Sequence, residues 1–207
     1  RELEFSALTK EFSDSAPLFD MFQNDGGTAE AFEQAYSVVS NRTELDKLIR
    51  TLWEKEWFGF AVDDSNEGKW HSAFDKVPPL GIAVSHSPGH SAFIDLENFE
   101  GGREAAIRTL ADLFANPYVE KSTHDYKSKV AVLRTMGIEI VGIKDDLMMA
   151  SYLLDSSRPH HEVEFLAQHN LNAYPHGDVP HGFTDSGWKA AIRADWTQQL
   201  TPILRKK

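Results

Sequence analysis

The sequence predicts an α/β fold in which helices flank a mixed sheet of about five strands. Two observations lead to this prediction. Short β-prone runs dominate the first half of the chain, and segments with helical spacing of apolar residues then alternate with further short runs. The chain has 207 residues, 41% of them hydrophobic, so it is long enough to bury the core that such a fold requires.

A helix is predicted over residues 43–55, after a short β-prone run at Tyr36–Val39. Asn41 can accept a hydrogen bond from an N–H of the first turn, and Glu44 lies three residues further on, as in a capping box. Apolar side chains then recur at helical spacing, at Leu45, Leu48, Ile49 and Leu52.

Three strands are predicted after this helix. They are the aromatic-rich run Trp57–Val62 and the runs Leu80–Val84 and Ser91–Leu96. The turn residues 87–90, Ser-Pro-Gly-His, separate the last two runs, which we therefore expect to form a hairpin. The polar stretch 63–76 predicts a loop.

Helices and short strands alternate in the remainder of the chain. The predicted helices are 103–115, 126–136, 146–154, 162–168 and 186–200, and the predicted strands are 118–123 and 138–141. Asn116-Pro117 and Gly137 end the first two of these helices, and the last is expected to end near Pro202. Three strands followed by alternating helices and strands are typical of the ribonuclease H-like order.

The composition limits the classes of function. The formal net charge is −11, and an acidic chain argues against tight, autonomous DNA binding, because phosphate contacts need a basic surface. The absence of cysteine excludes disulfides and thiolate metal sites and is typical of a cytoplasmic protein. No run of 18 apolar residues is present, and the charged start RELEF lacks a signal-peptide core, so we expect neither a membrane span nor a signal peptide.

Several stretches resemble the 3'-5' proofreading exonuclease region of bacterial DNA polymerase I, a family A DNA polymerase. The most specific is GIEIVGIKDDLMMASYLLD, at residues 137–155. YSVVSNRTELDKLI (36–49) is similar to the lead-in to that domain, and LGIAVSHSPGHSAFIDL (80–96) is similar to its hairpin. The resemblance implies a ribonuclease H-like 3'-5' exonuclease fold.

The resemblance also implies a domain organisation. RELEF, at the start of the chain, resembles the connector that leaves the 5' nuclease part of the polymerase. We therefore expect residues 1–35 to be this connector and residues 36–207 to be the exonuclease-like domain. The polymerase domain is absent from the sequence and is expected as a partner within the same full-length chain.

Active members of this family remove a mispaired 3' nucleotide with two Mg²⁺ or Mn²⁺ ions, held by carboxylates from four places. The first is an Asp-x-Glu on the first strand. In one register it falls on Asp63 and Ser65, and shifted by one residue it falls on Val62 and Asp64. Because side chains alternate along a strand, either register supplies one carboxylate. Alternatively, both acids are simply the solvated end of the strand.

Cations occupy two other ligand positions of the family. Asp125 takes the place of an asparagine, and Lys129 takes the place of a metal-binding aspartate, although lysine has no acceptor atom. On the last helix, the tyrosine and aspartate positions fall on Lys189 and Arg193. Asp195 lies two residues further on, about 200° around the helix, and is expected to face elsewhere.

Asp146 is the one clear acid that remains, and it matches the aspartate of the family's segment Phe-Asp-Thr-Met. An acid here also stabilises a helix N-terminus, and the two roles are compatible. We hypothesise that Lys129 or Arg193 replaces the metals as a counter-charge and pairs with Asp146. No intact catalytic site and no bound metal are therefore expected.

Other residues predict no further site. The histidines at 160, 161, 169, 176 and 181 lack metal-ligand spacing and are expected in exposed loops, and Ser151 lies outside any nucleophile elbow. Several aromatic side chains could stack on bases, but packing in the core is the favoured interpretation for Trp53, Trp57, Phe58, Phe60, Trp188 and Trp196.

The leading interpretation is a catalytically inactive exonuclease-like domain that serves as a structural platform for the polymerase in DNA replication and repair, with weak or indirect DNA contact. The alternative is an active metal-dependent proofreading exonuclease with non-standard ligands. It requires Asp63 or Asp64 to converge with Asp125 and Asp146. A free-standing binding module with the same fold is a third interpretation, and it predicts a gene product that ends near Lys207.

Overall fold

The computed structural model describes residues 35–63, 78–174 and 178–207, which belong to one compact unit, Phe32–Lys207. Almost all of the predicted connector and of the predicted loop at 63–76 lies outside the described residues. The elements follow the chain in this order: β1 (Ala35–Val39), α2 (Arg42–Trp53), β2 (Trp57–Val62), β3 (Gly81–Ser87), β4 (His90–Asp95), α3 (Arg103–Ala115), β5 (Glu120–Thr123), α4 (Tyr126–Thr135), β6 (Ile143–Asp146), α5 (Leu147–Leu154), α6 (Val163–Leu171) and α7 (Asp185–Arg205).

The described strands form one mixed sheet with the order β1-β4-β3-β2-β5-β6. β3 runs antiparallel to both neighbours, β2 and β4, while the pairs β1–β4, β2–β5 and β5–β6 are parallel. The predicted hairpin is confirmed as β3–β4. The prediction of an α/β fold with a mixed sheet is also confirmed, with six strands where about five were expected.

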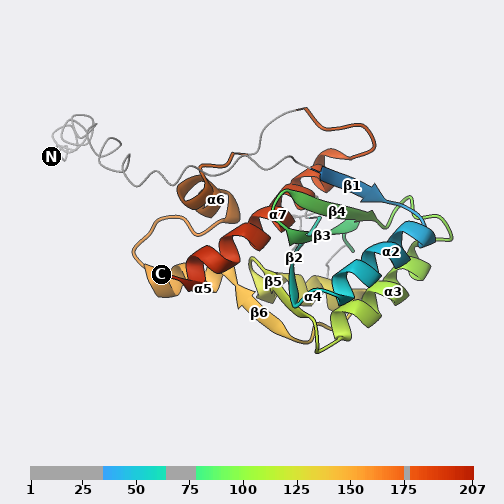
Figure 1. The fold of residues 1–207 in the computed structure, drawn as a ribbon, viewed down its shortest axis with the longest axis horizontal. Helices are drawn as coiled ribbons and strands as arrows, with labels where there is room; N and C mark the ends of the chain where they lie inside the picture. The colour runs from blue at the N-terminus through green and yellow to red at the C-terminus, as the bar shows by residue number, and fades with distance from the viewer. Residues whose placement is uncertain (1–34, 64–77, 175–177) are drawn as a thin grey trace, which may run out of the picture. The chain divides into compact units, whose positions relative to one another are not determined.

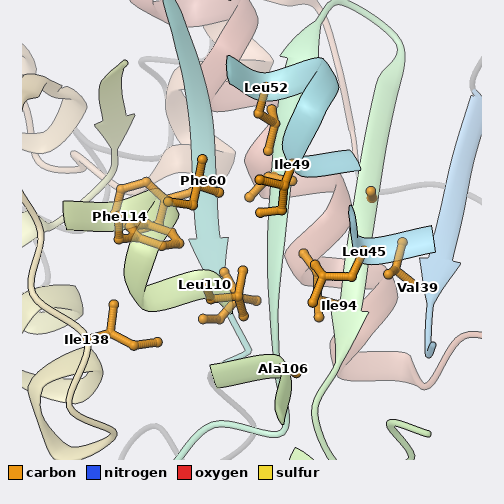
Figure 2. Packing of buried hydrophobic residues seen from close by; sticks show 14 of the residues in the cluster. Val39, Leu45, Ile49, Leu52, Phe60, Ile94, Ala106, Leu110, Phe114 and Ile138 are labelled. Atoms are coloured by element: carbon orange, nitrogen blue, oxygen red, sulfur yellow. The ribbon is translucent and has the colours of Figure 1, made fainter. Parts of the chain in front are cut away.

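Helices α2 and α3 cover one face of the sheet (Figure 1). Figure 2 shows the core between them and the strands, where Leu45 and Ile49 of α2 and Leu110 of α3 meet Phe60 of β2. The ring of Phe114 packs edge-on against that of Phe60, with 5.1 Å between the ring centroids. This apolar layer makes the sheet a rigid support for whatever its carboxyl edge carries.

Helix α7 packs against strands β2, β3 and β4 on the opposite face of the sheet. Small residues allow the close approach: Ala61 and Ala83 of the sheet lie in one cluster with Ala190, Ala191 and Ala194 of α7. Residues Gly59 and Ala61 therefore point toward α7, while Phe60 and Val62 point into the core under α2 and α3.

Local signals explain why most helices begin where they were expected. The side chain of Asn41 accepts a hydrogen bond from the Glu44 N–H at 3.0 Å and caps α2. Thr184 caps α7 through the N–H of Gly187 at 3.0 Å. α4 stops at Thr135, and Gly137, with φ of 76°, takes the left-handed conformation that glycine tolerates.

The last strand is not at the predicted position, residues 138–141. Ile138 is buried and only packs against the core, and the Val141 N–H bonds to the carbonyl of Phe114 outside the sheet. The chain joins β5 only after Gly142, whose φ is 74°, so that β6 is Ile143–Asp146. β6 is an edge strand, and an edge strand tolerates charged side chains. These charges gave the segment no apolar strand pattern in the sequence.

Helix α7 also runs further than predicted, through Pro202 to Arg205. Proline supplies no N–H to the carbonyl four residues earlier. Pro202 is exposed near the end of α7, and the helix continues past it for three more residues.

Most of the predicted core aromatics are buried. Phe58 and Phe60 are fully buried, and Trp188 and Trp196 are 9% and 5% exposed. The expectation is wrong for Trp53, which is 51% exposed at the end of α2. Across the described residues, no helix combines the length and the apolar character needed to span a membrane.

Candidate functional site

The predicted site residues gather at one edge of the sheet, because β2, β5 and β6 are parallel neighbours whose carboxyl ends meet there. Asp63 follows β2, Asp125 follows β5, and Asp146 ends β6. This edge is where α/β folds place ligand-binding side chains. Asp64 lies outside the described residues.

The carboxylate of Asp146 is occupied by backbone N–H groups. Its Oδ1 accepts hydrogen bonds from Asp125 at 3.1 Å and Met148 at 3.0 Å, with Met149 at 3.4 Å, while its Oδ2 accepts one from Tyr126 at 3.0 Å. Asp146 is therefore the N-cap of α5 and also holds the first residues of α4. The expected role at a helix N-terminus is confirmed.

The hypothesis that Asp146 pairs with Lys129 or Arg193 is wrong in this structure. All the hydrogen-bond partners of Asp146 are backbone groups, and it forms no ion pair within the described residues. Arg193 forms an ion pair with Glu164 of α6 instead, with 2.6 Å between Nε and Oε1.

Asp125 works as a cap as well. Its side chain accepts a hydrogen bond from the Ser128 N–H at 3.3 Å at the start of α4. The residue has φ of 54° and ψ of 65°, a left-handed conformation that is uncommon outside glycine and easier for Asp than for most residues. The Asp146 bond to the Asp125 N–H helps to stabilise this turn.

Asp63 is buried, with 3% of its surface exposed, so the alternative of a solvated strand end is wrong for this residue. Its Oδ2 accepts a hydrogen bond from the Ser186 hydroxyl at 2.8 Å, at the start of α7. The carboxylate thus joins β2 to α7, on the side of the sheet toward which Gly59 and Ala61 point.

The sheet register separates Asp63 from Asp146. Ser122 of β5 is level with Gly59 of β2, and Thr123, the next residue of β5, is level with Asp146. Asp146 is therefore about level with Phe60, and Asp63 lies three residues beyond Phe60, or about 10 Å along the strand at ~3.3 Å per residue. The two carboxylates are too far apart along the sheet for one ion to join them directly.

The two cations predicted at metal-ligand positions, Lys129 and Arg193, and Lys189 at the tyrosine position have different surroundings in the structure. Lys129 is half-buried on α4. Burial lowers the pKa of the nearby His124, and the charge of Lys129 adds a smaller effect in the same direction. Lys189 is exposed on α7, and Arg193 faces α6. Asp195 faces elsewhere, as expected: its carboxylate accepts hydrogen bonds from the Tyr36 hydroxyl at 2.7 Å and the Gly89 N–H at 2.9 Å.

Two histidines near this edge were not anticipated. The ring of His124 contacts the carbonyl of His161 at 2.7 Å, and His161 Nδ1 lies 2.8 Å from the hydroxyl of Ser151. The ring of Tyr152 stacks on that of His161, with 3.6 Å between centroids. His161 is 6% exposed, so the expectation of exposed loop histidines is wrong for it.

Ser151 and His161 have the contact of a nucleophile and its base, but Ser151 is fully buried. A substrate has no access to such a hydroxyl, so the pair ties α5 to the segment before α6. No sequence signal marked this contact, because the two residues are ten positions apart and neither belongs to a known spacing.

The donor set does not fit the two divalent ions of active relatives. Hard cations need several carboxylate oxygens that converge on them. Both oxygens of Asp146 accept N–H bonds, Asp63 is bonded to Ser186, and lysine and arginine carry no acceptor. Across residues 35–63, 78–174 and 178–207, no three His, Asp or Glu side chains are placed to hold a metal ion.

Comparison with known sequences identifies relatives of this chain. A family model described as DNA polymerase I, ribonuclease H-like domain, matches residues 78–176. DNA polymerase I of Pseudomonas aeruginosa is 26% identical over 178 residues, which are 81% of this chain and 18% of that protein. DNA polymerase I of Synechocystis is 25% identical over 163 residues, 73% of this chain and 15% of that protein. The chain thus spans less than a fifth of the length of these relatives.

Solved structures show the same fold at low sequence identity. Pol1 of M. smegmatis, in complex with DNA primer-template and dNTP, matches with a TM-score of 0.66 and 22% identity over 83% of this chain and 27% of that chain. RNase D of Trypanosoma brucei, in complex with RNA U12, matches with a TM-score of 0.67 and 11% identity over 84% of this chain and 63% of that chain.

NrnC of Brucella melitensis, bound to pGG, matches with a TM-score of 0.62 and 14% identity, over 85% of this chain and 81% of that chain. The sheet order and these structures identify the fold as that of a ribonuclease H-like 3'-5' exonuclease. Over residues 78–176, slightly less than half of its length, the chain is similar to the ribonuclease H-like domain of DNA polymerase I.

Proposed function

We propose that this chain is a catalytically inactive exonuclease-like domain that serves as a structural platform within a DNA polymerase I active in DNA replication and repair. One observation carries the proposal. Asp146 is the acid that matches the family pattern most clearly, and both of its carboxylate oxygens accept hydrogen bonds from backbone N–H groups. Lys129 and Arg193 stand where the resemblance places metal-binding aspartates.

The electrostatics of the edge support inactivity. Exchanging two aspartates for two cations changes the local charge by four units toward positive. An ammonium group repels a divalent cation, and the repulsion is strong where water is excluded. The roughly 10 Å offset between Asp63 and Asp146 along the strands adds a geometric obstacle.

The platform role is supported by the length of the relatives. The relatives are several times longer than this chain and are named DNA polymerase I, so a polymerase domain in the same protein is part of this proposal.

The net charge of −11 favours weak or indirect DNA contact over independent binding. The cytoplasm is the compartment we propose, in keeping with the absence of cysteine.

The alternative of an active nuclease is favoured by one observation, namely that Asp63, Asp125 and Asp146 follow neighbouring parallel strands. The two functions are separated by incubating the chain with end-labelled single-stranded DNA in Mg²⁺ or Mn²⁺. An enzyme of known 3'-5' exonuclease activity is the positive control, and EDTA gives the blank.

The proposal expects no loss of nucleotides above the EDTA blank. Metal-dependent trimming that an Asp63→Asn variant abolishes, while its circular dichroism spectrum stays native, would establish the active enzyme instead. Because Asp64 is the other candidate acid, Asp64→Asn is tested in the same way, and trimming that survives both substitutions would indicate a contaminating nuclease.

A further inference from the structure

Helix α5 exposes an unusual amount of apolar surface. Its sequence is LMMASYLL, and four of its eight residues are exposed large apolar or aromatic side chains. Leu153 is 84% exposed and Met149 52% exposed, and these two lie four residues apart on one side of the helix. We call the exposed set Met149, Tyr152, Leu153 and Leu154 the α5 patch.

The helix is held firmly in place, so the exposure is not a result of poor attachment. Asp146 caps its first turn, and Leu147 is fully buried in a cluster with Trp196 and Leu200 of α7. On the buried side, the hydroxyl of Ser151 contacts His161. α5 thus buries Leu147 and Ser151 but leaves four large apolar or aromatic side chains exposed, where a surface helix in water would carry mainly polar ones. Such a face marks an interaction surface.

The chain leaves the domain next to this patch. The guanidinium Nε of Arg205, at the end of α7, lies 2.9 Å from both carboxylate oxygens of Asp145, which is in β6 two residues before α5. Lys207 bonds through Nζ to Asn170 of α6 at 2.7 Å. Figure 1 shows the C-terminal end beside α5. In a longer protein, a segment that follows Lys207 would therefore start beside α5, the helix that carries the patch.

We infer that the α5 patch is the surface on which the polymerase domain of the full-length protein docks. The inference rests on the proposed function for the presence of that domain in the same protein, and the relatives named DNA polymerase I are several times longer than this chain. The inference does not depend on whether the nuclease site is inactive. The nuclease assay can therefore contradict the proposed function without affecting the docking inference, and the docking test can contradict the inference without affecting the assay.

The size of the patch favours a tethered partner over a second copy. Stable association between separate proteins takes roughly 20–30 residues on each side. Four side chains on one short helix fall well below that. A domain joined through α7 is held at an effective concentration in the millimolar range for a short linker, at which a small apolar contact is sufficient.

Amide hydrogen exchange tests the inference in two proteins, the full-length gene product and the 207-residue chain. In each protein, three forms are compared: wild type, Leu153→Asp and Tyr118→Asp. Tyr118 is 89% exposed before β5 and is the matched control. The α5 amides are expected to exchange at least tenfold more slowly in the full-length protein than in the 207-residue chain. Leu153→Asp should remove this difference, and Tyr118→Asp should leave it unchanged.

Three outcomes would overturn the inference. The first is equal exchange of α5 in the two proteins, and the second is a gene product that ends at Lys207. The third is protection of α5 in the 207-residue chain that grows with protein concentration and disappears in Leu153→Asp, since that would identify a second copy as the occupant.

Discussion

At the scale of single residues, Asp146 has a structural role at the position where the resemblance places a metal-binding aspartate. It lies at the carboxyl end of β6, and four N–H groups from the starts of α4 and α5 converge on it. A carboxylate that satisfies helix N-termini gains from their partial positive charge. The acid therefore has a structural reason to be present whether or not a metal binds.

Replacing Asp146 by alanine should destabilise the domain by about 2–3 kcal/mol, because α5 loses its cap and the first N–H groups of α4 lose their acceptor. Asp146→Asn, which keeps one acceptor oxygen, should cost less. Urea unfolding followed by circular dichroism measures both. Asp46→Ala is the control, since it removes an exposed ion pair with Arg42 and should cost under about 1 kcal/mol. Equal losses for Asp146→Ala and Asp46→Ala would contradict the capping role.

Lys121 of β5 is a second residue whose chemistry is unusual. Its side chain is fully buried, and its Nζ donates to the carbonyls of Asn116 and Val141. Burial lowers the pKa of Lys121 to about 8, from an ordinary value of 10.5. Its two acceptors flank β5 in the sequence, so the buried amine joins the end of α3 to the segment before β6.

The lowered pKa of Lys121 predicts a pH dependence of stability with a definite sign. Between pH 8 and about 10 the unfolded chain keeps a proton that the folded chain has released, so folded stability rises with pH. Relative to Lys121→Met, the wild-type free energy of unfolding should increase by roughly 2 kcal/mol across this range. Urea titrations at several pH values measure the difference. Lys127→Met, at an exposed position of α4, should give a curve parallel to wild type. A flat difference for Lys121→Met would contradict the prediction.

At the scale of elements, the contact between β2 and α7 depends on the absence of a side chain at Gly59. A Cβ at this position would lie 2.8 Å from both the carbonyl oxygen of Ala194 and the backbone N of Gln198. Gly187, at the start of α7, is also crowded, but there the neighbour at 2.6 Å is the ring of Phe93. A ring can shift, whereas the backbone of a packed helix cannot do so without moving the whole helix.

Gly59→Ala should therefore cost more than Gly187→Ala. We expect a loss above 2 kcal/mol for Gly59→Ala, because α7 must move away from the sheet. For Gly187→Ala the loss should be smaller, since alanine favours the helix by up to about 1 kcal/mol over glycine and this offsets part of the clash. Thermal or urea unfolding of both variants gives the ranking, and the reverse ranking would show that α7 is less rigid than its packing indicates.

The elements also show how far the sequence predicts this fold. The cap and the apolar periodicity locate α2, and the turn residues between two apolar runs locate the hairpin. Both signals act within a few residues. β6 was misplaced because an edge strand with Lys144 and Asp145 does not show apolar character, while Ile138 is apolar for packing alone. Pairing with β5 decides the position of the strand, and that interaction is between distant parts of the sequence.

At the scale of the whole molecule, the site was predictable in its location but not in its bonding. The resemblance places Asp63, Asp125 and Asp146 after strands, and the topology brings those strand ends to one edge. Nothing in the sequence indicates that Asp146 would be bound by backbone groups, or that Arg193 would pair with Glu164 from another helix. Such partners depend on how α4, α5, α6 and α7 pack, which single-residue matches do not describe.

The last prediction concerns the response of the folded chain to Mg²⁺. An ion with a Kd of 0.1 mM would stabilise the native state by about 2.7 kcal/mol at 10 mM, which raises the Tm of a domain of this size by roughly 5–10 °C. Since the acids at the sheet edge are bonded to N–H groups and to Ser186, we expect a shift below about 2 °C. The net charge of −11 makes the chain sensitive to salt in general, so NaCl at the same ionic strength is the control for scanning calorimetry. A rise of 5 °C or more that is specific to Mg²⁺ and is lost in Asp63→Asn would mean that the carboxylates turn from their present partners to the metal, and the proposal of an inactive domain would then fail.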